Sequence, residues 1–213
     1  MRTFINIKHR HDYELPEHFQ DDDVRFSGSL VRYFLNEFTQ EGDIVFDPFA
    51  GYGTTLFTAQ DMARVPYGIE YSEARYAFIQ ERLHSGQIIH GDSLRIPEYN
   101  LPRINMSITS PPYTRPQDPQ NPLKAYQTND GNYEDYLKGI QTIYGHIAKL
   151  LEPTAHVIIE VSNLKHELGV TPLAWHIAEH VSEVLRFEGE IIVCRDNYGF
   201  GYDHGYCLLF SAR

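Results

Sequence analysis

Two short segments hold the residues that could do chemistry. Residues 47–55 read Asp-Pro-Phe-Ala-Gly-Tyr-Gly-Thr-Thr, and residues 109–113 read Thr-Ser-Pro-Pro-Tyr. In the second segment the Ser110 hydroxyl and the Pro111 carbonyl can each accept a hydrogen bond, and two successive prolines restrict the backbone that aims them. Tyr113 can stack on a planar ring. Two fixed acceptors beside an aromatic ring suit an amine carried by a planar, unsaturated ring.

Each segment follows an expected strand. Residues 43–47 form a short apolar strand that runs into the glycine turn, and residues 104–109 form the strand before Ser110. Gly51 and Gly53 allow a tight turn and a close approach of the backbone to a ligand. The helix expected over 56–64 points its N-terminus at the same place, which favours a carboxylate there.

The remaining pattern alternates between strands and helices. Further strands are expected at 65–70, 87–90, 155–161, 190–194 and 206–210, and further helices at 30–38, 72–83, 133–151 and 171–185, with Ser72 and Thr171 as N-caps. Such alternation predicts an α/β fold with a doubly wound, mostly parallel sheet. The last two strands are expected to form an antiparallel edge pair at the C-terminus. We expect one domain over 1–213, with an irregular N-terminal arm at 1–25 and a substrate loop at 114–132.

Two acidic residues follow the next two strands. Glu70 ends the strand at 65–70, where a carboxylate can accept hydrogen bonds from ribose hydroxyls, and Asp92 follows the strand at 87–90. Ligands of doubly wound sheets bind at the carboxyl ends of the strands. A plainer interpretation makes Asp47 a helix-capping residue and Glu70 a surface residue. The order and spacing of all four segments favour the site.

In this order the motifs resemble the S-adenosylmethionine-dependent methyltransferases that modify exocyclic amino groups of nucleobases, a class I, Rossmann-like fold. Ser-Pro-Pro-Tyr is typical of the branch that methylates cytosine N4 in DNA, as in restriction–modification. The resemblance implies catalytic residues at Ser110, Pro111, Pro112 and Tyr113. It implies S-adenosylmethionine binding, with S-adenosylhomocysteine as product and no metal, by Phe26, Ser27, Asp47, Pro48, Phe49, Ala50, Gly51, Gly53, Thr54, Thr55, Glu70, Tyr71, Asp92 and Ser93. Within the substrate loop, Arg115, Lys124 and Tyr126 are expected to bind nucleic acid.

Composition and net charge limit the classes of protein to which the chain could belong. The formal net charge of −11 is unusual for a nucleic-acid binder, so a positive groove would have to be local. The two cysteines, Cys194 and Cys207, are far apart, which favours a reducing, cytoplasmic compartment. The sequence shows neither a secretory signal nor an apolar run of membrane-spanning length, and no membrane partner is expected.

Two alternatives stay open. The substrate could be structured RNA, because tRNA amino-methyltransferases share this architecture and a similar Pro-Pro-Tyr motif. The chain could also be a cofactor-binding subunit that needs a partner for activity. Only 100 residues follow Tyr113, so a homodimer or a separate recognition subunit would have to supply any large target-recognition region. His176 and His180 share a helix face, for which a structural role is favoured over a metal pair.

Overall fold

The computed structural model describes residues 2–8, 11–17, 19, 25, 27–167, 169–194 and 202–213. Phe26, which the resemblance implied as a cofactor contact, lies outside the described residues.

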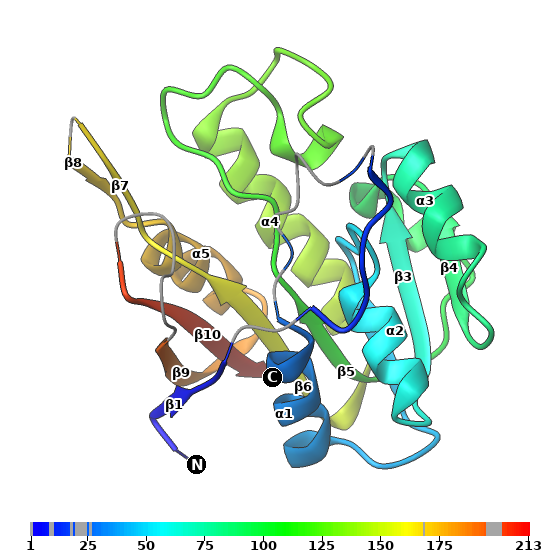
Figure 1. The fold of residues 1–213 in the computed structure, drawn as a ribbon. Helices are drawn as coiled ribbons and strands as arrows, with labels where there is room; N and C mark the ends of the chain where they lie inside the picture. Colours follow the sequence, from blue (N-terminus) through cyan, green and yellow to red (C-terminus); the bar gives the residue numbers. More distant parts are fainter. Residues whose placement is uncertain are drawn as a thin grey trace.

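The described chain is organised around a large, mostly parallel sheet (Figure 1). Its strand order is β1-β9-β10-β6-β5-β2-β3-β4. Strand β10 runs antiparallel to both β6 and β9, whereas the other neighbours are parallel. The predicted doubly wound fold with a C-terminal antiparallel pair is thereby confirmed. The strands are β1 (Phe4–Asn6), β2 (Ile44–Asp47), β3 (Val65–Glu70), β4 (Gln87–His90), β5 (Ile104–Thr109), β6 (Leu151–Val161), β9 (Arg186–Cys194) and β10 (His204–Ser211).

Helices cover both faces of the sheet. Successive residues of a strand point to opposite faces, so the central strands contribute apolar side chains to both. Val45 on β2 and Ile158 on β6 pack in the apolar cluster of α1 and α2, whereas their neighbours Phe46 and Ile159 pack in the cluster of α4 and α5. Within the described part, none of the helices combines the length and hydropathy needed to cross a bilayer. The helices are α1 (Gly28–Phe38), α2 (Thr54–Asp61), α3 (Glu73–Gln80), α4 (Tyr133–Ala148) and α5 (Leu173–Ser182).

The sequence expectations fail at short strands and at some element ends, since the helix expected to reach residue 151 ends at Ala148 and Leu151 already begins β6. The N-terminal arm is not irregular throughout, because Phe4–Asn6 forms β1 and pairs in parallel with β9. A small hairpin, β7 (Leu164–His166) and β8 (Gly169–Thr171), follows β6 and projects from the body (Figure 1). Thr171 therefore ends a strand, and Pro172 takes the N-cap position of α5 that was predicted for Thr171.

The substrate loop is held by hydrogen bonds among its own residues. The short 3-10 helix η3 (Pro122–Lys124) is capped by the Asn121 side chain, which accepts a hydrogen bond from the Leu123 N–H at 3.1 Å. The Gly131 N–H donates to the Pro119 carbonyl at 2.8 Å and closes the base of the loop. The loop lies beyond the carboxyl ends of the parallel strands, next to the N-terminus of α4 (Figure 1).

Candidate functional site

The two motifs meet at the carboxyl edge of the sheet. Strands β2 and β5 are parallel neighbours, so their carboxyl ends lie at the same edge. The Thr109 hydroxyl, at the end of β5, donates a hydrogen bond to Asp47 Oδ1, at the end of β2, over 2.5 Å. Thr109, the residue before Ser110, is therefore in direct contact with Asp47, the first residue of the glycine turn.

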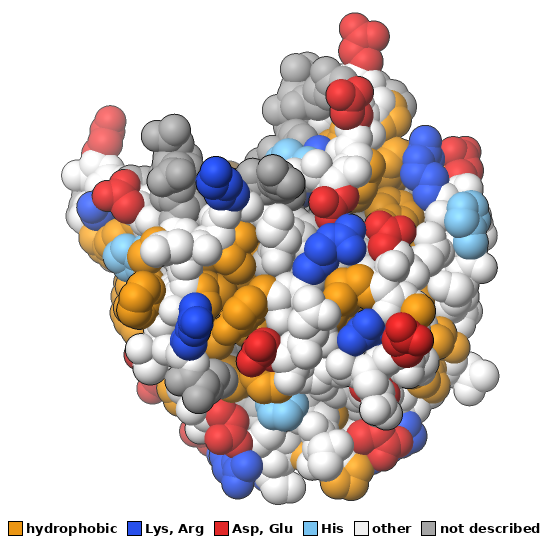
Figure 2. All heavy atoms as spheres, turned by 60° about the horizontal axis from the view of Figure 1, so that its bottom comes forward, with side chains coloured by type: hydrophobic (Ala, Val, Ile, Leu, Met, Phe, Trp, Pro, Cys, Tyr) orange, Lys and Arg blue, Asp and Glu red, His pale blue; other side chains and the backbone are white. Residues whose placement is uncertain are grey.

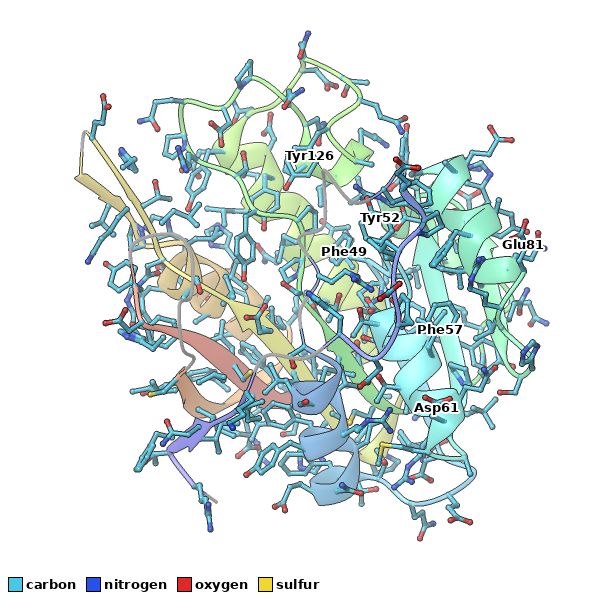
Figure 3. All side chains as sticks on the ribbon, in the orientation of Figure 1. Phe49, Tyr52, Phe57, Asp61, Glu81 and Tyr126 are labelled. Atoms are coloured by element: carbon cyan, nitrogen blue, oxygen red, sulfur yellow. The ribbon has the colours of Figure 1, made fainter. Side chains whose placement is uncertain are left out.

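The glycine turn has the tight geometry that its sequence predicts. Gly51 and Gly53 have φ angles of 57° and 86°, in the left-handed region that favours glycine. A Cβ atom at Gly53 would lie 2.8 Å from the Phe57 ring. Helix α2 begins directly after this turn, with Gly53 as its N-cap. Figure 3 shows Phe49 and Tyr52 between α2 and the loop that carries Tyr126.

Asp47 is an unusually placed carboxyl group. It is 1% exposed, and burial raises its pKa from 3.8 to about 6. Hydrogen bonds from Thr109, Thr55 and the Phe49 N–H favour the ionised form and limit that rise. Since the Phe49 and Thr109 bonds both fall on Oδ1, the turn and β5 share one acceptor atom.

Glu70 joins the turn to the end of β3. Its Oε2 accepts a hydrogen bond from the Gly51 N–H at 2.8 Å, and its Oε1 accepts one from the Ser72 N–H at 2.7 Å. Burial raises the pKa of this carboxyl, while the Ser72 bond and the positive charge of Arg75 act in the opposite direction. Glu70 therefore fixes the turn and the start of α3 around one buried acid.

A cavity of about 910 Å³ opens beside this network. Tyr71, Asp92 and Lys124 are among its lining residues, so it joins the ends of β3 and β4 to the substrate loop. The Lys124 ammonium forms an ion pair with Asp92 Oδ2 and lies 5.2 Å from the centre of the Tyr71 ring. Lys124, expected to contact nucleic acid, thus lies among residues expected to bind the cofactor.

Other predicted cofactor residues form hydrogen bonds in the glycine turn or with the elements around it. The Ser93 hydroxyl donates to the Pro48 carbonyl, and the Thr55 hydroxyl donates to the Ile108 carbonyl at 3.4 Å. Thr54 lies within 3.4 Å of the Tyr13 hydroxyl. The Ala50 N–H donates to the Ile69 carbonyl at 2.9 Å, and the Ser27 carbonyl accepts the first main-chain bond of α1.

The Ser-Pro-Pro-Tyr motif is held from two sides. The Tyr113 hydroxyl donates to Glu160 Oε2 at 3.2 Å, and the Tyr113 carbonyl accepts a hydrogen bond from the Tyr126 hydroxyl at 2.6 Å. Ser110 is half-buried at the end of β5. Arg115 turns into the substrate loop, where its main-chain N–H donates to Asp118 Oδ2 at 2.9 Å.

Two residues at the site were missed by the sequence analysis. The Tyr13 hydroxyl donates to the Tyr52 carbonyl at 2.6 Å, so the N-terminal arm supports the glycine turn. Glu160 interrupts an otherwise apolar run one residue before the end of β6 and contacts Tyr113. The same logic that identified Asp47 and Glu70, an acid at the end of a buried strand, would have found Glu160. No comparable signal marks Tyr13.

The histidine pair on α5 has other partners. His176 Nδ1 lies 2.8 Å from the Tyr133 hydroxyl, and His180 Nδ1 lies 2.8 Å from the His176 carbonyl. Among the residues that the structure describes, no group of three or more metal-ligating side chains is found.

Basic and acidic side chains are interspersed on the face shown in Figure 2. The described part of that face therefore shows no extended basic surface.

The sequence comparisons with known proteins match only part of the chain. A family model described as DNA methylase matches residues 4–81. Over 87 residues the chain is 31% identical to the type II methyltransferase M.BglII of Bacillus subtilis, covering 40% of this chain and 22% of that protein. The chain resembles the amino-methyltransferases of DNA. It spans about a fifth of the length of this curated relative.

Solved structures extend the likeness to the whole fold. TrmN from Thermus thermophilus has a TM-score of 0.65 at 15% identity, covering 92% of this chain and 52% of that one. A TehB-like S-adenosylmethionine-dependent methyltransferase from Corynebacterium glutamicum has a TM-score of 0.60 at 10% identity, covering 92% and 93%. An rRNA methylase from Streptococcus thermophilus has a TM-score of 0.58 at 12% identity, covering 89% and 99%. The chain therefore has the class I methyltransferase fold.

Proposed function

We propose that this chain transfers a methyl group from S-adenosylmethionine to an exocyclic amine of a nucleobase, with cytosine N4 in DNA as the first candidate. The hydrogen bond from Thr109 to Asp47 carries the proposal. It brings the glycine turn, which suits the cofactor, against the Ser-Pro-Pro-Tyr motif, which suits the amine. Neither motif alone would specify a transfer reaction.

The residues present fit the cofactor. The turn at Gly51 and Gly53 brings main chain close to a ligand at a place where a Cβ on Gly53 would collide with Phe57. Glu70 keeps acceptor capacity for ribose hydroxyls beyond its two main-chain bonds. The cavity is lined by the Tyr71 ring and the Asp92 carboxylate, which we assign to adenine, with Lys124 in contact with both. When bound, S-adenosylmethionine supplies an electrophilic methyl group on a sulfonium centre.

The chain's own residues orient the amine. The lone pair of an exocyclic amine is delocalised into the ring, so it must be turned towards the methyl donor before it can react. The Ser110 hydroxyl and the Pro111 carbonyl accept the two amine protons and favour that geometry. Tyr113 stacks on the base, which has to leave the helix to reach this edge of the sheet. No strong base is required, because the product amine can release its proton after transfer.

DNA is the favoured substrate because of the serine in the motif and the match to a DNA methylase family over residues 4–81. RNA is the second candidate. The observation in its favour is the fold-level likeness to TrmN and to an rRNA methylase over most of this chain. We also propose a homodimer or a separate recognition subunit as the source of further target recognition. A cofactor-binding subunit that is inactive without its partner is the third alternative.

Replacing Ser110 with alanine tests the chemical assignment. We expect Ser110→Ala to slow transfer of tritiated methyl groups to DNA by about 100-fold, because an acceptor aimed at the reacting group is lost. S-adenosylhomocysteine affinity, measured by calorimetry, should stay within about twofold. Ser85→Ala, at an exposed turn, is the matched control and should behave as wild type. Full activity of Ser110→Ala would remove this residue from the mechanism.

A further inference from the structure

Glu160 is a buried carboxylate at the carboxyl end of β6. It is 2% exposed, and its neighbours Ile159 and Val161 belong to the apolar core. An ionised carboxyl group is far more costly to bury than the aliphatic side chains beside it, unless polar partners compensate. A carboxylate kept in this place calls for a role that an apolar residue could not fill.

The sheet places Glu160 beside the chemical motif. Strands β5 and β6 are parallel, and Thr109 lies opposite Ile159. Ser110 therefore leaves β5 at the level of Glu160. On the other side, Gly205 of β10 comes close, since a Cβ there would lie 3.6 Å from Glu160 Oε1. The carboxylate thus sits between β10 and the point where the motif leaves the sheet.

Tyr113 is the link between Glu160 and the proposed reaction. Its hydroxyl donates to Glu160 Oε2 at 3.2 Å, and its ring packs against the apolar cluster of α4 and α5. Its carbonyl is bound by Tyr126. The tyrosine is therefore restrained at its phenolic end and at its main chain.

We propose that Glu160 is a positioning residue that fixes the Tyr113 ring for stacking on the target base. This inference rests on the proposed function. A ring already held in one orientation loses less side-chain freedom when the base stacks on it. The negative charge beside the ring also repels phosphate, so the neutral base rather than the nucleic-acid backbone is favoured at this point.

The test compares Glu160→Leu, Glu160→Gln, Tyr113→Phe and the double variant Glu160→Leu/Tyr113→Phe. We expect Glu160→Leu to raise the KM for DNA by about tenfold, from the loss of a hydrogen bond to a charged acceptor, with a smaller change in kcat. Glu160→Gln should recover most of this loss, because its amide oxygen can still accept from the phenol. The double variant should be no worse than either single change, because both remove one interaction. Glu179→Leu, an exposed position on α5, is the control.

A spectroscopic readout separates failure of this inference from failure of the proposed function. With tyrosine labelled at Cζ by carbon-13, the Tyr113 signal, assigned by its loss in Tyr113→Phe, should shift in both Glu160 variants. If wild type methylates nucleic acid but Glu160→Leu leaves KM unchanged, or if the double variant shows additive losses, the positioning role is overturned and the proposed function stands. If the Tyr113 signal shifts but wild type methylates no nucleic acid, the proposed function fails, and the positioning role fails with it. If Glu160→Leu does not fold, the same comparison is made with Glu160→Gln, Tyr113→Phe and the double variant Glu160→Gln/Tyr113→Phe. The double variant should again be no worse than either single change.

Discussion

Asp47→Asn should stabilise the protein while weakening cofactor binding. Burial raises the pKa of Asp47 from 3.8 to about 6, so the folded state disfavours the ionised form. At about 1.4 kcal/mol per pKa unit, that difference corresponds to about 3 kcal/mol at neutral pH. Asparagine removes the buried charge, and its Oδ1 can keep the bonds from Phe49 and Thr109. Its new amide N–H group needs an acceptor, so we expect a gain of about 1 to 3 kcal/mol.

The pH dependence gives this prediction its sign. A carboxyl whose folded pKa is raised contributes fully to stability below its unfolded pKa of 3.8, and that contribution is lost as the pH rises through about 6. The stability of wild type relative to Asp47→Asn should therefore fall between about pH 4 and pH 6 and level off above it. At about 2 to 4 °C per kcal/mol for a chain of this size, the variant should melt about 2 to 12 °C higher at pH 7.5.

The assay is urea unfolding of wild type and Asp47→Asn from pH 4 to pH 8, with calorimetric titration of S-adenosylhomocysteine at pH 7.5. Asp61→Asn is the control, because Asp61 is 54% exposed and lies at the far end of α2 from the glycine turn (Figure 3). Its stability should change by no more than about 0.5 kcal/mol. A variant at Asp47 that is less stable than wild type at pH 7.5, or a difference that does not vary with pH, would refute the reasoning.

Two further predictions concern the cofactor side of the site. Gly53→Ala should destabilise the protein by about 1 to 3 kcal/mol, because φ is 86° and the new Cβ would lie 2.8 Å from Phe57. It should also lower S-adenosylhomocysteine affinity at least tenfold in calorimetry, and unchanged values for both quantities would argue against a strained turn. Lys124→Met should weaken S-adenosylhomocysteine binding about threefold to tenfold, because Asp92 and Tyr71 lose the cation that positions them. Lys149→Met, at an exposed position, should leave this affinity unchanged. Equal effects of the two variants would mean that Lys124 acts only through its overall positive charge.

Elements with strong local patterns could be predicted from the sequence. The strands Val65–Glu70 and Gln87–His90 were predicted with their observed bounds. Each is a short segment with apolar residues, and an acidic site residue ends the first and follows the second closely. The three-residue strands β1, β7 and β8 could not be predicted. Their existence depends on pairing rather than on local pattern, and β1 pairs with residues near the other end of the chain.

The residues of the site likewise fall into those that the sequence could predict and those that it could not. Acids at the ends of buried strands are visible in the sequence, and the structure places Asp47 and Glu70 in one network around the glycine turn. Contacts made by loops are not visible. The ion pair between Lys124 and Asp92 depends on the path of a loop without periodicity, which only tertiary packing decides.

Identification of the methylated nucleoside tests the central claim most directly. Purified protein would be incubated with S-adenosylmethionine carrying a trideuterated methyl group, in parallel with duplex DNA, single-stranded DNA and total tRNA, and the digested nucleosides analysed by mass spectrometry. We predict a trideuteromethyl group on the exocyclic amine of a base, first of all N4 of deoxycytidine in DNA. A label on a ring carbon or ring nitrogen, or no label in any nucleic acid, would contradict the proposed amine methylation.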